Sequence, residues 1–229
     1  MTVTAKPKDE KPKAERPRAK AKKEAPKREV ILPEMKLFGK WDSKVEVKDL
    51  GLSHYIDLKP RLLPRSAGIN QKHRFHKSKM HIAERLALHM MVPGHTGKRH
   101  RITSGTMAGG FMKVMGIVEK AFRIIEEKTK KNPVEVFVRA LENASVTEEI
   151  ISYQLGSVMA RDAVITAPQR RVDKALRSFA QGAYKSTFRK KTTAGEALAN
   201  EIIAASNNSN ESHAIKEKER MESEASGAR

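Results

Sequence analysis

Basic side chains are concentrated between Lys59 and Arg101, where they could neutralise a polyanion. This stretch holds eleven Lys and Arg residues against one acidic residue, Glu84, together with six of the chain's eight histidines. Its centre is the sequence KHRFHKSKM, HIAERLALHMM and VPGHTGKRHR (Lys72–Arg101). Like charges at this density repel one another unless a polyanion lies against them. We therefore predict a nucleic-acid-binding surface made of a basic arm and a basic loop, with a helix between them that positions both.

Two further blocks carry a similar excess of positive charge. Residues 1–28 contain eleven Lys and Arg against four acidic residues, and residues 161–191 contain nine against two. The 229-residue chain has a net charge of +19, and the residues outside the three blocks are slightly acidic. Such clustering predicts a phosphate polymer as the partner. Because only 5% of the residues are aromatic, we expect recognition of a folded RNA by its backbone and shape rather than base stacking on a sheet.

Other kinds of site are poorly supported by the spacing of these residues. His73 and His76, or His81, Glu84 and His89, could be metal ligands, but the chain has no HExxH motif and no cysteine. Residues 94–98 (GHTGK) lack the length, the following Ser or Thr and the preceding strand of a phosphate loop. No Ser/His/Asp set stands out. We therefore expect no metal, no cofactor and no enzymatic activity.

The composition also limits the cellular compartments in which the protein is expected. The lack of cysteine excludes a disulfide framework and fits a reducing compartment. No apolar run approaches the roughly 18 residues that a membrane helix needs, and the N-terminus lacks the apolar core of a signal peptide. We expect a cytoplasmic protein without a membrane partner.

The chain divides into three parts. Residues 1–29 are rich in Lys, Ala, Pro and Glu, with no Ile, Leu or aromatic residue, and are predicted to be a disordered basic tail. Residues 30–71 contain the only tryptophan, Trp41, and two prolines in DLKPRLLP, which predicts an extended N-terminal arm. Residues 72–229 are predicted to form a single, mainly α-helical domain with one projecting β-hairpin.

About five to six helices are expected from apolar residues that recur at intervals of three and four. In the first helix, Ile82, Leu86 and Met90 share one face, with Ala83 and Leu88 nearby. The last helix is highly charged with little core, so it is expected to need a partner. The predicted helices are Met80–Val92, Phe111–Thr129, Pro133 to about Ala144, Gln169–Phe188, Thr193 to about Ala205, and His213–Glu224.

The hairpin is predicted at about 149–165. Two runs of β-favouring residues, Ile150–Leu155 and Val158–Ile165, flank Gly156-Ser157, a pair suited to a tight turn.

Several separated segments resemble the small-subunit ribosomal protein seven family, in its archaeal and eukaryotic form and most closely the archaeal one. They occur in the same order as in that family, and the resemblance covers roughly Leu37–Glu224. The segments are DLKPRLLPRS (57–66), KSKMHIAERLALHMMVPG (77–94), NPVEVFVRALENA (132–144), GSVMARDAVITAPQRRVDKAL (156–176) and NEIIAASNNSNESHAIKEKERME (200–222).

The resemblance implies a structural component of the small ribosomal subunit. Members of the family bind the 3′ major (head) domain of small-subunit rRNA, help nucleate head assembly, and lie near the exit-site tRNA and the mRNA exit. The expected partners are therefore rRNA, nearby tRNA and mRNA, and neighbouring head proteins, with no cofactor and no homo-oligomer. The alternative that we keep open is a DNA-binding regulator, with Gln169–Phe188 as its recognition helix; this would require a dimer.

The resemblance also implies rRNA-binding residues in the basic arm, the basic loop and the last basic block. These residues are Lys72, Arg74, Lys77, Lys79, Lys98, Arg99, Arg101, Arg170, Arg171, Lys174, Arg177, Lys185, Arg189, Lys190 and Lys191. The hairpin departs from the arginine-rich pattern of the family, since it carries Arg161 beside Asp162. The hairpin therefore offers little positive charge for direct contact with rRNA phosphates, and the hairpin residues considered near tRNA or mRNA are Tyr153, Gly156, Met159 and Arg161.

Overall fold

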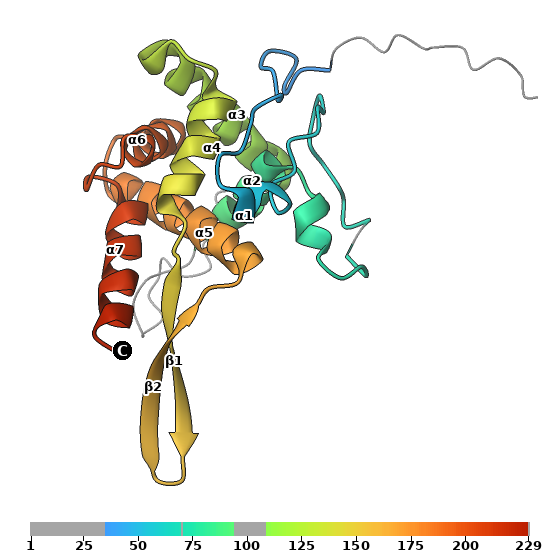
Figure 1. Cartoon of the computed structure of the whole chain (residues 1–229). Coiled ribbons are helices and arrows are strands. Elements are labelled where there is room, and N and C mark those ends of the chain that lie inside the picture. The colour runs from blue at the N-terminus through green and yellow to red at the C-terminus, as the bar shows by residue number, and fades with distance from the viewer. Residues whose placement is uncertain (1–34, 70, 94–108, 229) are drawn as a thin grey trace, which may run out of the picture. The chain divides into compact units, whose positions relative to one another are not determined.

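The computed structural model describes residues 35–69, 71–93 and 109–228 of the chain (Figure 1). In this part the fold is mainly helical, with one two-stranded antiparallel sheet, as predicted. The elements are α1 (Leu50–Ser53), the 3-10 helix η1 (His76–Lys79), α2 (Ile82–Met91), α3 (Phe111–Thr129), α4 (Pro133–Ala144), β1 (Glu148–Leu155), β2 (Val158–Ile165), α5 (Pro168–Thr187), α6 (Ala194–Ser206) and α7 (His213–Ser226). The predicted tail and the basic loop with Lys98, Arg99 and Arg101 lie outside the described residues.

A row of aromatic rings runs through the core and joins the arm to the helices. The ring centroid of Trp41 lies 5.8 Å from that of Phe122 in α3, which lies 5.7 Å from Phe137 in α4. Phe137 in turn lies 6.3 Å from Phe179 in α5. Edge-on and tilted contacts at this spacing are the favoured arrangement of aromatic pairs. The predicted arm is therefore anchored in the same core as the helices.

The apolar periodicity located the helices closely. The bounds of α3 and α4 agree with the prediction, and α6 begins after Thr193, which forms a capping box with Glu196. The helix α2 begins later than predicted because the His81 side chain accepts a hydrogen bond from the Ala83 amide and so acts as its N-cap. The placement of Leu88 near the core face was wrong, since this side chain is exposed. The helix α1 was not predicted, because four residues are too few for a periodic pattern.

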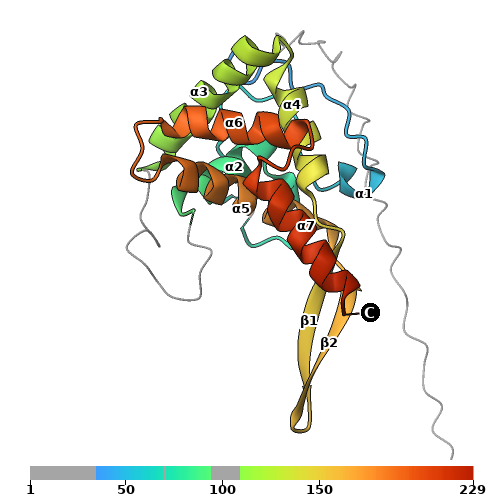
Figure 2. The same cartoon turned by 90° about the vertical axis from the view of Figure 1, so that its left-hand side faces the viewer.

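The helix α5 is the central element. It packs against α2, α6 and α7, and its buried residues include Val172, Leu176 and Phe179. The helix α6 packs in addition against α3 and α4 (Figure 2). No helix of the described residues has the length and apolar character that a membrane span requires.

The hairpin leaves this helical body and extends away from it (Figure 1). Leu155 pairs with Val158 across a two-residue turn, and Gly156 occupies it with a φ of 60°, which favours glycine. The predicted hairpin is confirmed, with a first strand that begins at Glu148.

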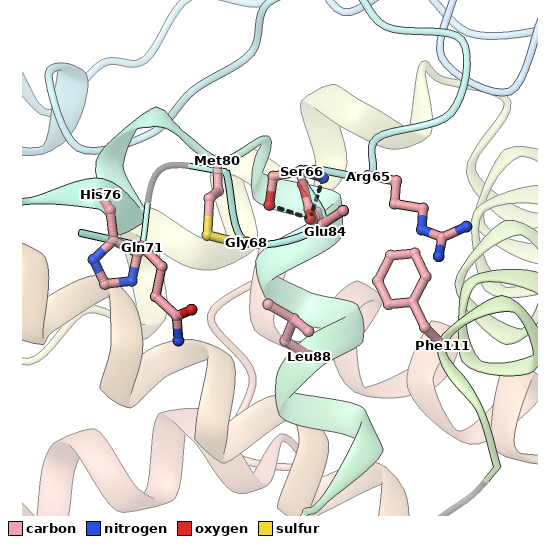
Figure 3. A pocket seen from close by; sticks show the side chains of 10 residues that line it. Arg65, Ser66, Gly68, Gln71, His76, Met80, Glu84, Leu88 and Phe111 are labelled. Atoms are coloured by element: carbon pink, nitrogen blue, oxygen red, sulfur yellow. Dashed lines mark hydrogen bonds between the residues drawn. The ribbon is translucent and has the colours of Figure 1, made fainter. Parts of the chain in front are cut away.

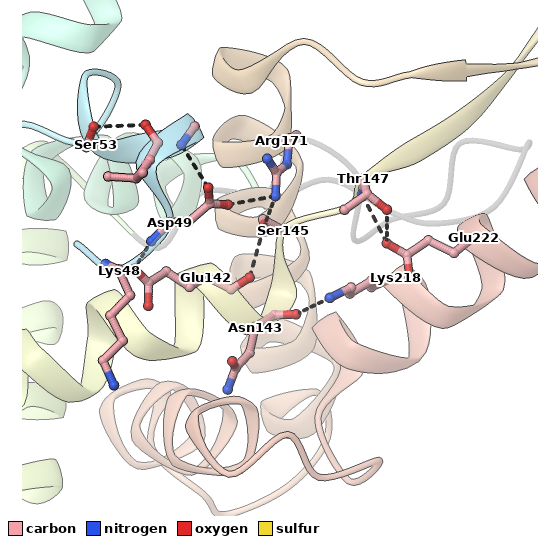
Figure 4. Close-up of polar contacts among 12 residues, drawn as sticks. Lys48, Asp49, Ser53, Glu142, Asn143, Ser145, Thr147, Arg171, Lys218 and Glu222 are labelled. Atoms are coloured by element: carbon pink, nitrogen blue, oxygen red, sulfur yellow. Dashed lines mark hydrogen bonds and ion pairs between the residues drawn. The ribbon is translucent and has the colours of Figure 1, made fainter.

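The helix α7 does not need an external partner, contrary to our expectation. Ala214, Ile215 and Ala225 are buried, and the helix packs on β1 and α5. The Glu222 carboxylate accepts hydrogen bonds from the amide and hydroxyl of Thr147 at the base of the hairpin (Figure 4). The helix thus buries three apolar side chains and is joined to the hairpin by these polar contacts.

Candidate nucleic-acid interface

The basic arm precedes α2 as a turn followed by η1. Lys72, Arg74 and Lys79 are exposed there. Lys77, in contrast, directs its Nζ to within 3.0 Å of the Oδ2 atom of Asp173 in α5. The arm thus presents some cations to solvent and uses one to fasten itself to the central helix.

Asp173 is a common partner for cations from two different elements. Besides Lys77, it accepts a hydrogen bond from Arg85 Nη2 at 3.0 Å, and His89 Nε2 lies 3.7 Å away. Burial tends to raise the pKa of Asp173, but the close approach of His89 and the hydrogen bonds from Lys77 and Arg85 outweigh it and hold the pKa well below its usual range. The carboxylate therefore stays ionised and fixes η1, α2 and α5 to one another.

A second carboxylate, Glu149 at the base of the hairpin, gathers two cations of α5. Its oxygens lie 2.7 Å from Arg170 Nε and 2.5 Å from Lys174 Nζ. Burial would raise the pKa of Glu149, but the hydrogen bonds from Arg170 and Lys174 lower it overall. The Arg170 side chain still has 60% of its surface exposed, whereas that of Lys174 has 19%, so only Arg170 keeps much freedom to reach a phosphate.

Arg171 lies in an internal ion pair with the arm (Figure 4). Its Nη2 donates to Asp49 Oδ2 and to Ser145 Oγ, each at 3.0 Å, and 16% of the side chain is exposed. The paired arginines that the sequence suggested as equivalent RNA ligands therefore differ in environment. Arg171 thus links α5 to Asp49, the N-cap of α1.

The remaining predicted cations in the described residues are exposed and make no ion pair with a carboxylate. Lys185 Nζ lies 3.4 Å from His213 Nε2, and the Arg189 guanidinium covers the Phe188 ring at 5.3 Å. These cations are Lys72, Arg74, Lys79, Arg177, Lys185, Arg189, Lys190 and Lys191.

The hairpin carries little positive charge but a large apolar surface. Leu155, Val158 and Met159 are each more than half exposed around its tip. The Tyr153 hydroxyl donates to Asp162 at 2.5 Å, while Arg161 and Gly156 are exposed. The hairpin is thus better suited to apolar and shape contacts than to phosphate binding.

A cavity of about 380 Å³ lies beside the basic arm (Figure 3). Leu88, Met80 and Phe111 form its apolar wall, which explains why Leu88 is exposed. Glu84 lies against it, with Oε1 accepting hydrogen bonds from the Ser66 amide at 2.6 Å and hydroxyl at 2.7 Å. This carboxylate is engaged in holding the Ser66 turn.

The histidines that could have been metal ligands have other roles. His81 is buried and caps α2, and burial lowers its pKa to about 4. His89 lies beside Asp173. In the ranges that the structure describes, no three His, Cys, Asp or Glu side chains are grouped closely enough to hold a metal ion.

Three acidic residues organise these cations, namely Asp49, Glu149 and Asp173, and this role was not predicted from the sequence for any of them. Asp173 lies within the basic segment Arg170–Arg177. An acidic residue inside a basic block was the signal that could have identified it as a partner of cations. Asp49 and Glu149 gave no such signal, because their partners are distant in sequence.

Comparison with known proteins identifies the family of the chain. Residues 54–229 match the model of the family described as ribosomal protein S7p/S5e. A small ribosomal subunit protein uS7 from Nanoarchaeum equitans is 48% identical over 197 residues, 86% of this chain and 100% of that protein. Proteins of the same name from Methanococcus maripaludis and Methanothrix thermoacetophila are 44% and 42% identical, covering 86% and 85% of this chain and 100% of each relative.

These matches confirm the resemblance found in the sequence, including its archaeal character. They also identify the chain as a structural rather than an enzymatic protein. The family match, residues 54–229, includes the helices α2 to α7 and the hairpin, and the relatives align with 85–86% of the chain. The chain belongs to the S7p/S5e family of ribosomal proteins.

Proposed function

We propose that this chain binds the 3′ major (head) domain of small-subunit rRNA and helps to nucleate folding of the head in the cytoplasmic ribosome. The observation that carries the proposal is the set of exposed Lys and Arg side chains without carboxylate partners, namely Lys72, Arg74, Lys79, Arg177, Lys185, Arg189, Lys190 and Lys191. Family membership makes ribosomal RNA the expected polyanion.

The division of cations into paired and unpaired ones supports this role. Lys77, Arg171 and Lys174 hold the elements together through internal carboxylates. The unpaired cations are then presented from a rigid scaffold, so less ordering is needed when RNA binds. Each phosphate that they neutralise releases condensed counterions, which makes binding strongly dependent on salt.

The hairpin supports a second part of the proposal, proximity to the exit-site tRNA and the mRNA exit. Its exposed apolar tip, Leu155 to Met159, lacks the cations for binding phosphate by charge. We propose that it meets RNA or a neighbouring head protein by shape and apolar contact, with Tyr153, Gly156, Met159 and Arg161 on that surface. We expect no homo-oligomer.

A DNA-binding regulator is less well supported. A recognition helix must leave one long face free to enter the major groove. The helix α5, which corresponds to the candidate recognition helix, is instead packed against α2, α6 and α7, and its Arg171 and Lys174 are committed to internal carboxylates.

The proposal is tested by binding of the purified chain to a transcript of the archaeal head domain, measured at several salt concentrations. A DNA duplex and an RNA duplex of equal length serve as controls. We expect tighter binding to the head domain at every salt concentration, with a steep decrease of affinity as salt increases. Equal affinity for the head domain and either duplex would contradict specific rRNA recognition, and a preference for the DNA duplex would favour the regulator.

A further inference from the structure

Phe75 is an exposed aromatic residue in the middle of the basic arm. Half of its surface, 50%, is accessible to solvent. No ring–ring contact involves it within the described ranges, and its sequence neighbours Lys72, Arg74 and Lys79 are exposed cations. An aromatic ring in this position gains little from the hydrophobic core.

The backbone at Phe75 is held in an unusual conformation. Its φ of 56° and ψ of 29° place it in the left-handed region, which bulky side chains rarely adopt and which favours glycine or asparagine. The turn is nevertheless well defined, because the Ser78 amide donates to the Phe75 carbonyl at 3.0 Å and the His76 amide to the His73 carbonyl at 3.2 Å. A phenylalanine kept at a strained, exposed position points to a role outside the fold.

Arg74 completes the arrangement. Its guanidinium carbon lies 4.9 Å from the centroid of the Phe75 ring, a distance at which a cation is attracted to the face of the ring. The guanidinium covers one face and keeps its charge. Half of the Phe75 surface remains exposed, and the guanidinium offers donors to an anion nearby.

We infer that Phe75 is a stacking position for an unpaired nucleobase, with Arg74 contacting the adjoining phosphate. The inference rests on the proposed binding of rRNA and deepens it, since backbone neutralisation alone gives an aromatic ring no function. The arm is fastened to α5 by Lys77 and Asp173, so the ring is presented in a fixed place, as a stacking residue requires. The low aromatic content argued only against base stacking on a sheet of aromatic residues. A single ring on a basic turn can stack on a base without such a sheet.

The test separates stacking from charge. Phe75→Leu keeps an apolar side chain at the same left-handed position but removes the aromatic face. Phe75→Tyr and Phe75→Trp keep an aromatic face. Arg74→Ala removes the charge. As a matched control we choose Leu50→Ala, which changes a more exposed apolar residue outside the basic arm. Binding to the head-domain transcript is measured for each variant across a range of salt concentrations.

We expect Phe75→Leu to bind at least roughly fivefold more weakly, the lower range for loss of one stacked base, with an unchanged salt slope because no charge is lost. Phe75→Tyr, Phe75→Trp and Leu50→Ala should bind like the unaltered chain. Arg74→Ala should lower the salt slope by about one unit.

Fluorescence of the Phe75→Trp variant gives a direct readout. The only natural tryptophan, Trp41, is buried, so a change in emission on binding reports on position 75. We expect quenching by single-stranded RNA and none by inorganic polyphosphate, which supplies phosphates without bases. The inference would be overturned if Phe75→Leu bound the transcript with wild-type affinity, or if polyphosphate quenched the Phe75→Trp emission as strongly as RNA does; rRNA binding would then still stand. Wild-type affinity of Phe75→Leu is also the result expected if Phe75 contacts a protein instead. Failure of the unaltered chain to bind the transcript would remove the proposed function and this inference together.

Discussion

Arg85 Nη2 lies 3.0 Å from Asp173 Oδ1 and so links α2 to α5 through an ion pair in which 3% of the arginine side chain is exposed. Removal of one partner from such a pair leaves a buried charge without compensation, which is strongly destabilising. Because Asp173 also holds Lys77, the same carboxylate couples the core to the position of the basic arm.

We predict that Asp173→Asn lowers the free energy of unfolding by about 3 kcal/mol, since the cationic Arg85 stays buried while its counterion is lost. Denaturation by urea measures the change. The control is Glu127→Gln, which removes the same charge from an exposed position on α3 and should change the stability by less than about 0.5 kcal/mol. Equal effects of the two substitutions would show that net charge, not the ion pair, is responsible.

The buried His81 makes stability depend on pH. Burial lowers the pKa of His81 in the folded chain from 6.5 to about 4. Between these two pH values the unfolded chain therefore binds a proton at His81, whereas the folded chain does not. The stability is therefore complete above pH 6.5 and decreases as the pH falls toward 4, by roughly 3 kcal/mol in total for this residue.

We predict that His81→Asn removes this part of the pH dependence. Asparagine is a good N-cap and can accept the same hydrogen bond from the Ala83 amide, but it does not titrate. The measurement is the difference in unfolding free energy between the two proteins from pH 7.5 to 4.5. A constant difference over that range would mean that His81 is protonated without penalty in the folded state.

Gly182 and Glu201 form a pair whose coupling can be measured. A Cβ atom at Gly182 would lie 2.8 Å from the carboxyl carbon of Glu201, and Glu201 Oε1 is held by hydrogen bonds from Ser212 Oγ at 2.7 Å and the Ala214 amide at 3.0 Å. Glu201 therefore cannot move away without releasing the N-terminus of α7.

We predict that Gly182→Ala destabilises the natural chain by about 1–3 kcal/mol, the usual cost of overpacking. In a Glu201→Ala background the same change should stabilise the protein by up to about 1 kcal/mol, because alanine is the better helix former. A double-mutant cycle by thermal unfolding measures the difference. The same effect of Gly182→Ala in both backgrounds would exclude a steric conflict with Glu201.

Two arginines of α5 should separate positioning from RNA binding. Arg171→Ala removes an internal ion pair and is expected to cost about 1–3 kcal/mol of stability, with little change in the salt slope of RNA binding. Arg177→Ala removes an exposed cation and should lower the salt slope by about one unit, with a stability change within about 0.5 kcal/mol. Urea denaturation and RNA titration on the same samples give both values. A lowered slope for Arg171→Ala would show that this side chain leaves Asp49 to contact phosphate.

The local elements could be predicted because their signals are local. The asparagine cap and proline of α4, the capping box of α6 and the Gly-Ser turn of the hairpin each satisfy backbone groups within a few residues. The inward residues Ile82, Leu86 and Met90 of α2 followed from their spacing in the same way. Leu88 and α7 were misjudged because burial depends on what packs against a helix, which a single helix does not encode.

The sequence by itself determined that the chain is basic in blocks, helical with one hairpin, and suited to a polyanion, because composition and periodicity are properties of the chain. Only the tertiary structure decided which cations are available. Arg170 and Arg171 are adjacent in sequence, yet one is largely exposed and the other is paired with Asp49, a residue of the distant arm. The physical reason is that the environment of a charge depends on its neighbours in space, and these come together only when the arm, α5 and the base of the hairpin pack on one another.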